Sequence, residues 1–271
     1  MNAFEFAHHI LNNGDIASKL LNPSNVSDFS GTYEPFLYDV PVRNPEFQFS
    51  DDKIKFPRKN SLGDLKQRAK TLHFFANHEL LAIEMMAFAI LAFPEMTSMQ
   101  RKIMLSTIGD EQRHFSLYCS RMSDFGINFG DFPLNQFFWK FTPLMDSLEQ
   151  FYAIVALTFE QANLDFAKHY QSIFQDIGDE KTAQIIKEVY EDEIKHVARG
   201  KMELERNLED PEELWAYYES LLPANLTAER GKGIHFDREG RIKSGLPMHF
   251  IDSIKDYKSG FKVTNRRQWK K

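Results

Sequence analysis

One short pattern of acidic and imidazole side chains occurs twice in the chain. The motif Asp-Glu-x-x-His stands at residues 110–114 and again at residues 192–196. In a helix, residues three positions apart lie on one face, so each motif would present a carboxylate beside an imidazole. Carboxylate and imidazole ligands without a thiolate suit iron or manganese. The repeated motif therefore predicts a metal site.

A third Glu-x-x-His, formed by Glu5 and His8, lies near the start of the chain and lacks the preceding aspartate. Glu-x-x-His alone is weak evidence of a metal site, because such a pair is also common on helix surfaces. We interpret the pair Glu5 and His8 as accidental. The two full motifs are much harder to explain by chance.

Two further glutamates precede the motifs at nearly equal distances. Glu79 stands 32 residues before Glu111, and Glu160 stands 33 residues before Glu193. A helix rises about 1.5 Å per residue, so this spacing lets the chain follow one helix, turn, and return to the same level on the next. The sequence thus reads as two similar helical hairpins. The predicted metal ligands are Glu79, Glu111, His114, Glu160, Glu193 and His196.

The charge of this ligand set predicts the number of metal ions. Each predicted ligand falls on an apolar stripe of its helix, so all should face one interior. A buried carboxylate without a partner is unfavourable by several kcal/mol and tends to bind a proton or a cation. Four carboxylates and two neutral imidazoles carry a charge of −4, which suits two divalent ions.

The aspartate of each motif has a separate predicted role. A metal-bound imidazole normally donates its other N–H group to a carboxylate or a carbonyl. We expect Asp110 to orient His196 and Asp192 to orient His114, in a crossed arrangement. The alternative is that each aspartate forms a surface salt bridge.

Long helices are needed to position these side chains. Four stretches have helical periodicity and few interruptions, and short connections join them, so the predicted fold is an all-α four-helix bundle. The expected helices cover residues 64–92, 98–125, 143–176 and 179–209.

The chain divides into three predicted segments. Residues 1–62 contain a short helix and a proline-rich strap that packs on the core. Residues 63–210 form the bundle, and residues 211–271 form a helical and loop extension with a last short helix near Pro247.

Composition excludes several classes of protein. The 271 residues carry a net charge of −6, which does not favour nucleic acid, although a cluster at residues 266–271 leaves a tRNA substrate open. We interpret that cluster as a solvated tail. The single cysteine, Cys119, excludes an internal disulfide. We expect no signal peptide and no membrane span, and therefore a cytoplasmic protein.

With these residues the chain resembles the ferritin-like di-iron carboxylate superfamily. The segment NHELLAIEMM from Asn77, the two motifs and the tail from Gly231 are most similar to an uncharacterised bacterial group of ferritin-like proteins. That group is compared with the di-iron tRNA hydroxylases. The resemblance implies a ferritin-like bundle that binds two iron ions, with manganese and iron as an alternative pair. It places the six predicted ligands on the superfamily's ligand positions.

The resemblance also implies chemistry. The leading hypothesis is a di-iron oxidoreductase that uses O₂ to hydroxylate or otherwise oxidise an unidentified organic substrate, with electrons from an external donor. The alternatives are a ferroxidase or peroxide-detoxifying protein without an organic substrate, and a non-catalytic bundle stapled by metal. A homodimer is compatible with the sequence. Val189 stands where some N-oxygenating members have an extra histidine, which argues against that activity.

Several residues near the predicted ligands have two interpretations. Small residues could leave room for a substrate, and the candidate pocket comprises Ala82, Tyr118, Ala156 and Gly200. Gly200 fits either a cavity or close helix packing. Tyr118 matches a radical tyrosine of ribonucleotide reductases but is more simply a core residue. We expect Glu84 to contact the N-terminal strap, with ligation as the alternative, and His78 to point away from the ligands.

Overall fold

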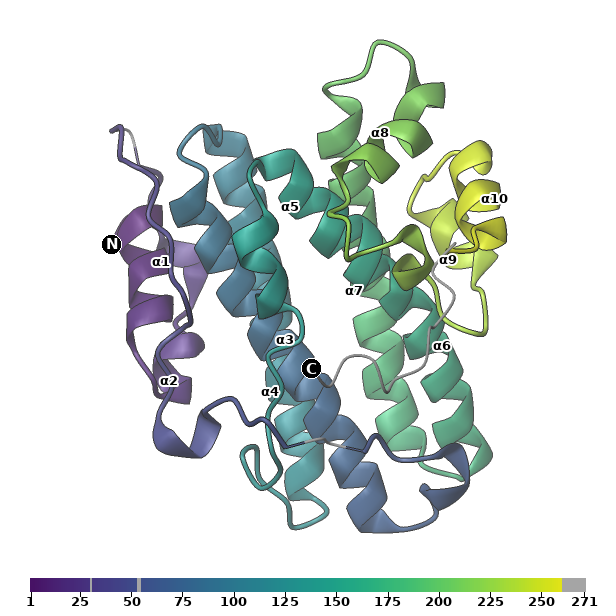
Figure 1. The fold of residues 1–271 in the computed structure, drawn as a ribbon. Helices are drawn as coiled ribbons and strands as arrows, with labels where there is room; N and C mark the ends of the chain where they lie inside the picture. Colours follow the sequence, from purple (N-terminus) through teal and green to yellow (C-terminus); the bar gives the residue numbers. More distant parts are fainter. Residues whose placement is uncertain (30, 53–54, 260–271) are drawn as a thin grey trace, which may run out of the picture. The chain divides into compact units, whose positions relative to one another are not determined.

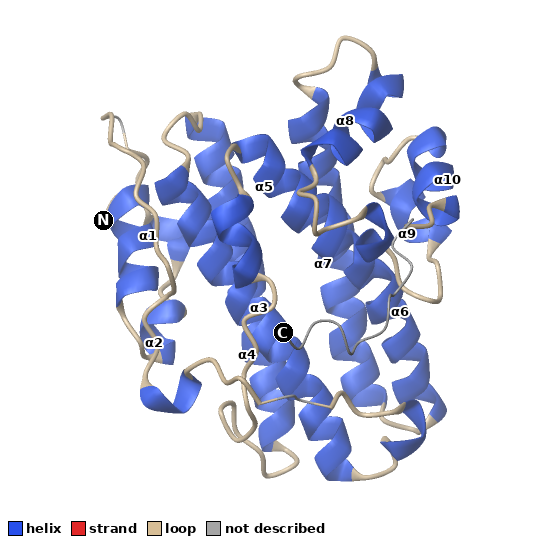
Figure 2. Cartoon of the chain, in the orientation of Figure 1, coloured by secondary structure: helices blue, strands red, loops and turns tan. Residues whose placement is uncertain are grey.

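The computed structural model describes residues 1–29, 31–52 and 55–259, and these residues are predominantly helical (Figures 1 and 2). They contain no β-strand, which confirms the all-α prediction. The α-helices are α1 (Ala3–Asn12), α2 (Ile16–Lys19), α3 (Leu65–Ala92), α4 (Ser98–Ser123), α5 (Leu148–Ile154), α6 (Gln161–Asp176), α7 (Glu180–Glu205), α8 (Leu214–Leu221), α9 (Arg238–Lys243) and α10 (Met248–Asp256). The basic cluster at residues 266–271 lies outside the described residues.

By contact, the chain divides into two compact units. Among the described residues, unit 1 comprises residues 1–148 and 171–185, and unit 2 comprises residues 149–170 and 186–259. The boundary falls inside α6 and α7, so each of these helices belongs partly to both units. The three predicted segments are a different division of the chain and stay a prediction.

Helix α3 is the core helix of unit 1. The carboxylate of Asp64 caps its start by accepting hydrogen bonds from the amides of Lys66 and Gln67, and the helix ends before Pro94. By length and composition α3 could cross a membrane, but 78% of its most apolar window is buried inside the protein. We interpret it as a core helix for that reason.

Helix α4 runs antiparallel to α3 and lies against it (Figure 1). A capping box between Thr97 and Gln100 starts α4. Gly126, with φ +73°, turns the chain after its last turn, as the sequence predicts. This hairpin brings residues from two helices to one level.

Helices α6 and α7 form the second long hairpin. Gly178, with φ +73°, lies in the three-residue connection between them. The prediction of an uninterrupted helix from residue 143 to residue 176 is wrong. A 3₁₀ helix covers Trp139–Leu144, α5 begins at Leu148, and a π-helical turn at Val155–Glu160 separates α5 from α6. Pro143 lies inside this 3₁₀ helix and has no backbone N–H to donate.

Within unit 1, the turn between α6 and α7 is tied to the first hairpin by ion pairs. The buried carboxylate of Asp179 accepts hydrogen bonds from Arg68 of α3, at 3.2 Å, and from Arg121 of α4, at 2.8 Å. Arg121 also donates to the hydroxyl of Thr182. The start of α7 is therefore held by both α3 and α4.

The N-terminal strap is held to α3 by a buried charged cluster around Glu84. Arg43 donates to both oxygens of the Glu84 carboxylate, at 3.1 and 2.6 Å. Lys19 lies 3.1 Å from the same carboxylate, and it donates to the carbonyls of Ile10 and Val42. The predicted contact between Glu84 and the strap is confirmed.

Substitution Glu84→Gln should destabilise the protein by about 3–5 kcal/mol, because it leaves two buried cations without their counter-charge. The free energy of unfolding, measured with urea, checks this. Glu191→Gln is the matched control, because Glu191 is exposed and lies 3.9 Å from Lys187. The control should change stability by less than about 0.5 kcal/mol. Equal effects of the two substitutions would contradict this account of the strap.

Candidate metal centre

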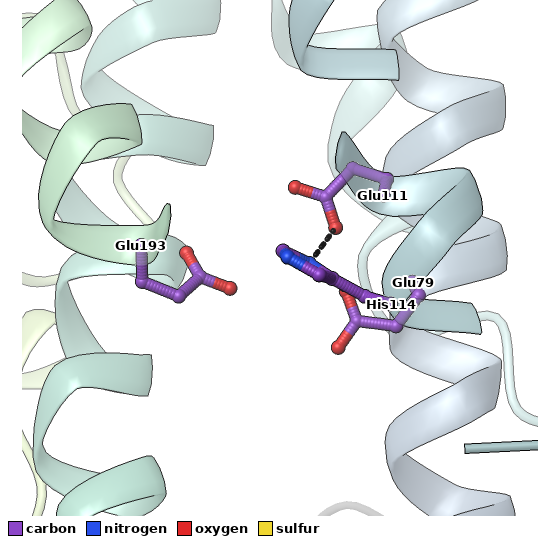
Figure 3. Close-up of side chains that lie close together, drawn as sticks. All are labelled: Glu79, Glu111, His114 and Glu193. Atoms are coloured by element: carbon purple, nitrogen blue, oxygen red, sulfur yellow. Dashed lines mark ion pairs between the residues drawn. The ribbon is translucent and has the colours of Figure 1, made fainter. Parts of the chain in front are cut away.

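Unit 1 contributes three of the predicted ligands from facing positions on α3 and α4 (Figure 3). Nδ1 of His114 lies 3.4 Å from Oε2 of Glu111 and 3.7 Å from Oε2 of Glu79. One ligand atom from each of the three residues lies within 4.8 Å of the others. All three side chains are buried. We call this set the first ligand triad.

The negative charge of the first triad and its burial affect the pKa of Glu79. Burial raises the pKa of Glu79 well above its ordinary value, and the negative charge of Glu111 raises it further. His114 acts in the opposite direction but does not reverse the shift. Without a cation, two carboxylates at this distance therefore favour sharing a proton.

Unit 2 contributes a second triad, formed by Glu160, Glu193 and His196. Oε2 of Glu193 lies 3.6 Å from Nδ1 of His196, and ligand atoms of Glu160 and His196 lie within 4.8 Å of each other. Asn163 donates a 2.7 Å hydrogen bond to Oε1 of Glu193. Within the described residues, Oε2 of Glu193 has no hydrogen-bond partner. Figure 3 labels Glu193 on its helix.

The sequence missed two features of the second triad. Asn163 has no role in the motif, although its position three residues after Glu160 could have suggested a shared face. The π-helical turn ends at Glu160 and changes the direction in which that side chain leaves its helix. Periodicity analysis assumes a regular helix, so it cannot find such a turn.

The donor set of each triad fits a divalent cation. Two carboxylates and one neutral imidazole carry a charge of −2, and one buried oxygen of Glu193 accepts no hydrogen bond and is available to a cation. No thiol belongs to either cluster. Burial raises the pKa of the single cysteine, Cys119, to about 12. Oxygen and nitrogen ligands of this kind suit iron and manganese. The buried carboxylate and histidine clusters could thus hold metal ions.

The two motif aspartates have partners on their own helices. Asp192 accepts a 2.7 Å hydrogen bond from Lys195, and Asp110 lies 4.0 Å from Arg113. These are the ion pairs of the alternative interpretation, although Asp192 is buried and so is no ordinary surface residue. The crossed orientation of the two imidazoles stays a prediction.

Residues given lesser roles have contacts that need no metal. The Glu5 side chain closes a capping box with Asn2, and Nδ1 of His8 lies 2.8 Å from the hydroxyl of Tyr38. These contacts agree with an accidental Glu5 and His8 pair. His78 packs between the rings of Phe74 and Phe138, and burial lowers its pKa to about 4.

Two of the four candidate pocket residues pack against each other. A Cβ atom added to Gly200 would lie 2.3 Å from the Cβ atom of Ala156. Close helix packing is therefore the correct interpretation of Gly200, and the predicted space beside His196 is filled there. Tyr118 is buried, and its ring lies 5.6 Å from that of Phe75, as expected for a core residue. A pocket at Ala82 stays a prediction.

The raised pKa of Glu79 predicts how the metal-free protein responds to pH. Stability from a carboxyl whose pKa is raised on folding is complete below the ordinary pKa of 4.5 and is lost as pH rises through the folded value. Glu79→Gln should remove this loss and make the metal-free protein relatively more stable near pH 8. Urea unfolding between pH 4.5 and 8 checks it, with exposed Glu191→Gln as control. An unchanged pH dependence in Glu79→Gln would contradict the assignment.

Close packing at Gly200 predicts that even the smallest side chain is too large. Gly200→Ala should destabilise the protein by about 1–3 kcal/mol through overpacking against Ala156, despite the better helix propensity of alanine. Gly63→Ala is the control, because nothing lies within 4 Å of a Cβ added there. Thermal unfolding compares the two variants. A Gly200→Ala protein as stable as Gly63→Ala would show that α7 has room at this position.

Comparisons with known proteins identify the family without assigning a function. Neither the curated proteins nor the solved structures gave a match to the chain. A family model described as a protein of unknown function, DUF455, matches residues 5–252, a range that includes both ligand triads. The chain therefore belongs to the DUF455 family.

Proposed function

We propose that the two ligand triads together hold a pair of iron ions, and that the protein is an oxidoreductase that uses O₂. The observation that carries the proposal is the repetition of one buried set, two carboxylates and an imidazole, in both halves of the chain. Each triad has the charge to neutralise one divalent ion. With three protein ligands in each triad, a bound ion would keep coordination positions free for a reactant.

The chain's own groups would bind, orient and desolvate the metals. Asn163 holds one oxygen of Glu193 and leaves the other for a cation. The histidines direct Nδ1 towards the carboxylates of their triads. Because the ligands are buried, bulk water is excluded and electrostatic interactions are strong.

Bound iron would supply electrons to dioxygen at this site. The proposal includes an organic substrate and an external electron donor. In this proposal the protein acts in the cytoplasm and does not bind a membrane. The proposal requires neither a homodimer nor a tRNA substrate. The pairs Fe/Fe and Mn/Fe use the same ligands.

One observation favours ferroxidase activity as a second candidate. An organic substrate needs a cavity next to the metals, and the contact between Gly200 and Ala156 fills one place where the sequence predicted such space. A ferroxidase needs access for ferrous ions and oxygen alone. The two candidates share the metal centre and differ in what is oxidised.

Metal content tests the shared part of the proposal. Protein purified without oxygen and incubated with Fe(II) should bind two ions per chain. Glu111→Ala and Glu193→Ala should each lower that number or weaken binding at least about tenfold. Glu5→Gln, outside the triads, is the control and should bind two. Elemental analysis after gel filtration measures the ratio, and a ratio of one or zero in the fully loaded wild-type protein would contradict the proposal of two metal ions.

Oxygen uptake separates the two candidates. With two Fe(II) ions per chain and no substrate, an organic-substrate oxidase should react with oxygen once and stop. A ferroxidase should continue to oxidise added Fe(II) beyond two equivalents per chain. An oxygen electrode and ferrous-ion assay distinguish these results, and absence of any reaction of the loaded protein with oxygen would contradict both.

A further inference from the structure

The π-helical turn at Val155–Glu160 decides where Glu160 points. Each residue of an α-helix turns the chain by about 100°, and a π-helical turn inserts one extra residue. If the turn became a regular α-helix, Glu160 would rotate by about 100° relative to α5. All six residues of the turn are buried. What holds this turn therefore holds the second ligand triad.

The first contact to the turn is made by Thr158 and Tyr218. The Thr158 hydroxyl donates a 2.8 Å hydrogen bond to the carbonyl of Ala153, five residues earlier. The Tyr218 hydroxyl lies 2.8 Å from the same Thr158 oxygen. Since the Thr158 proton points to Ala153, Tyr218 is the donor in this second bond. A buried side chain of α8 thus supports the hydroxyl that bridges the wide turn.

The second contact is made by Gln161 and Arg241. With its amide oriented so that both ends are satisfied, Gln161 donates to the carbonyl of Leu157 at 2.7 Å and accepts from Nε of Arg241 at 3.0 Å. The Arg241 guanidinium also binds Asp165 through both oxygens, at 2.6 and 2.9 Å, and donates to the carbonyl of Gly231. Arg241 is fully buried. It links α9 to the backbone on the far side of the turn.

Gly231 shows how closely the C-terminal residues approach the turn. A Cβ atom added to Gly231 would lie 3.3 Å from the carbonyl oxygen of Leu157 and 3.3 Å from the hydroxyl of Tyr218. The 3₁₀ helix Ala228–Gly231 contacts the π-helical turn directly. The C-terminal residues reach the turn's own backbone as well as its side chains.

We propose that residues 214–243, here called the C-terminal clamp, hold the π-helical turn in place, and that Tyr218 and Arg241 are positioning residues for Glu160. The inference rests on the proposed function, in which Glu160 binds metal. The clamp stabilises an irregular turn that a regular helix would otherwise replace. Loss of the clamp lets the turn relax and moves Glu160 away from Glu193 and His196.

Two conservative variants test the clamp. Tyr218→Phe removes the hydroxyl that donates to Thr158, and Thr158→Val removes both hydrogen bonds but keeps a β-branched side chain. Tyr190→Phe is the matched control, because its hydroxyl binds Asp237 in the clamp, at 2.6 Å, without reaching the π-helical turn. Hydrogen exchange of residues 155–161 in the metal-free proteins and Mn(II) titration of each protein are measured together.

Both clamp variants should exchange these amides at least about tenfold faster than the wild-type protein, and the control should not. One of two Mn(II) equivalents should bind about 10–100-fold more weakly in the clamp variants. Unchanged exchange, or Mn(II) affinity equal to that of Tyr190→Phe, would overturn the clamp. Wild-type protein that binds no Mn(II) would instead overturn the proposed function, whereas the exchange result is obtained without metal.

Discussion

Buried negative charge is the constraint on which this structure depends. Glu79, Glu111 and Glu193 are each at most 4% exposed, and they lie beside imidazoles that are no more exposed. A helical core made of leucine and phenylalanine would be more stable without these carboxylates, because ionised groups lose much of their solvation energy on burial. Burial and the neighbouring Glu111 carboxylate raise the pKa of Glu79, which favours the protonated form of this group in the metal-free protein. In the function that we propose, a divalent cation in each triad would neutralise this charge instead.

The surrounding helices carry further buried charge that is already neutralised. Glu84 lies on the other side of α3 from Glu79 and has Lys19 and Arg43 as partners. Asp165 of α6 has Arg241. These clusters hold the N-terminal strap and the C-terminal clamp to the long helices. In each cluster the carboxylate is paired with a lysine or an arginine of the same cluster. The ligand triads differ from them because they contain no lysine or arginine, which is why we assign a cation to the triads alone.

The sequence predicted the parts of the fold and site that follow a regular period. Four long helical stretches, the hairpin spacing of about 33 residues and the repeated motif identified two sets of ligands, and each set lies together within its unit. The contact of Glu84 with the strap also followed from its position five residues after Glu79.

Sequence analysis missed the features that depart from regular helical periodicity, because they depend on contacts between distant parts of the chain. The π-helical turn depends on the hydroxyl of Thr158 and on Tyr218, 60 residues further along the chain, so no local pattern indicates it. The packing of Gly200 on Ala156 depends on how close two helices approach, and glycine is compatible with either a cavity or a contact. Arg241 looks like a solvent-exposed residue in a charged, glycine-rich tail, but Asp165 makes its burial favourable.

The claim that both triads form one centre is tested most directly by electron paramagnetic resonance of the Mn(II)-loaded protein. Two manganese ions about 3–4 Å apart should be spin-coupled and give a multiline spectrum with about half the hyperfine spacing of an isolated ion. The account predicts that coupled spectrum at two ions per chain and its loss in Glu193→Ala. A six-line spectrum of isolated ions at full loading would contradict a shared centre.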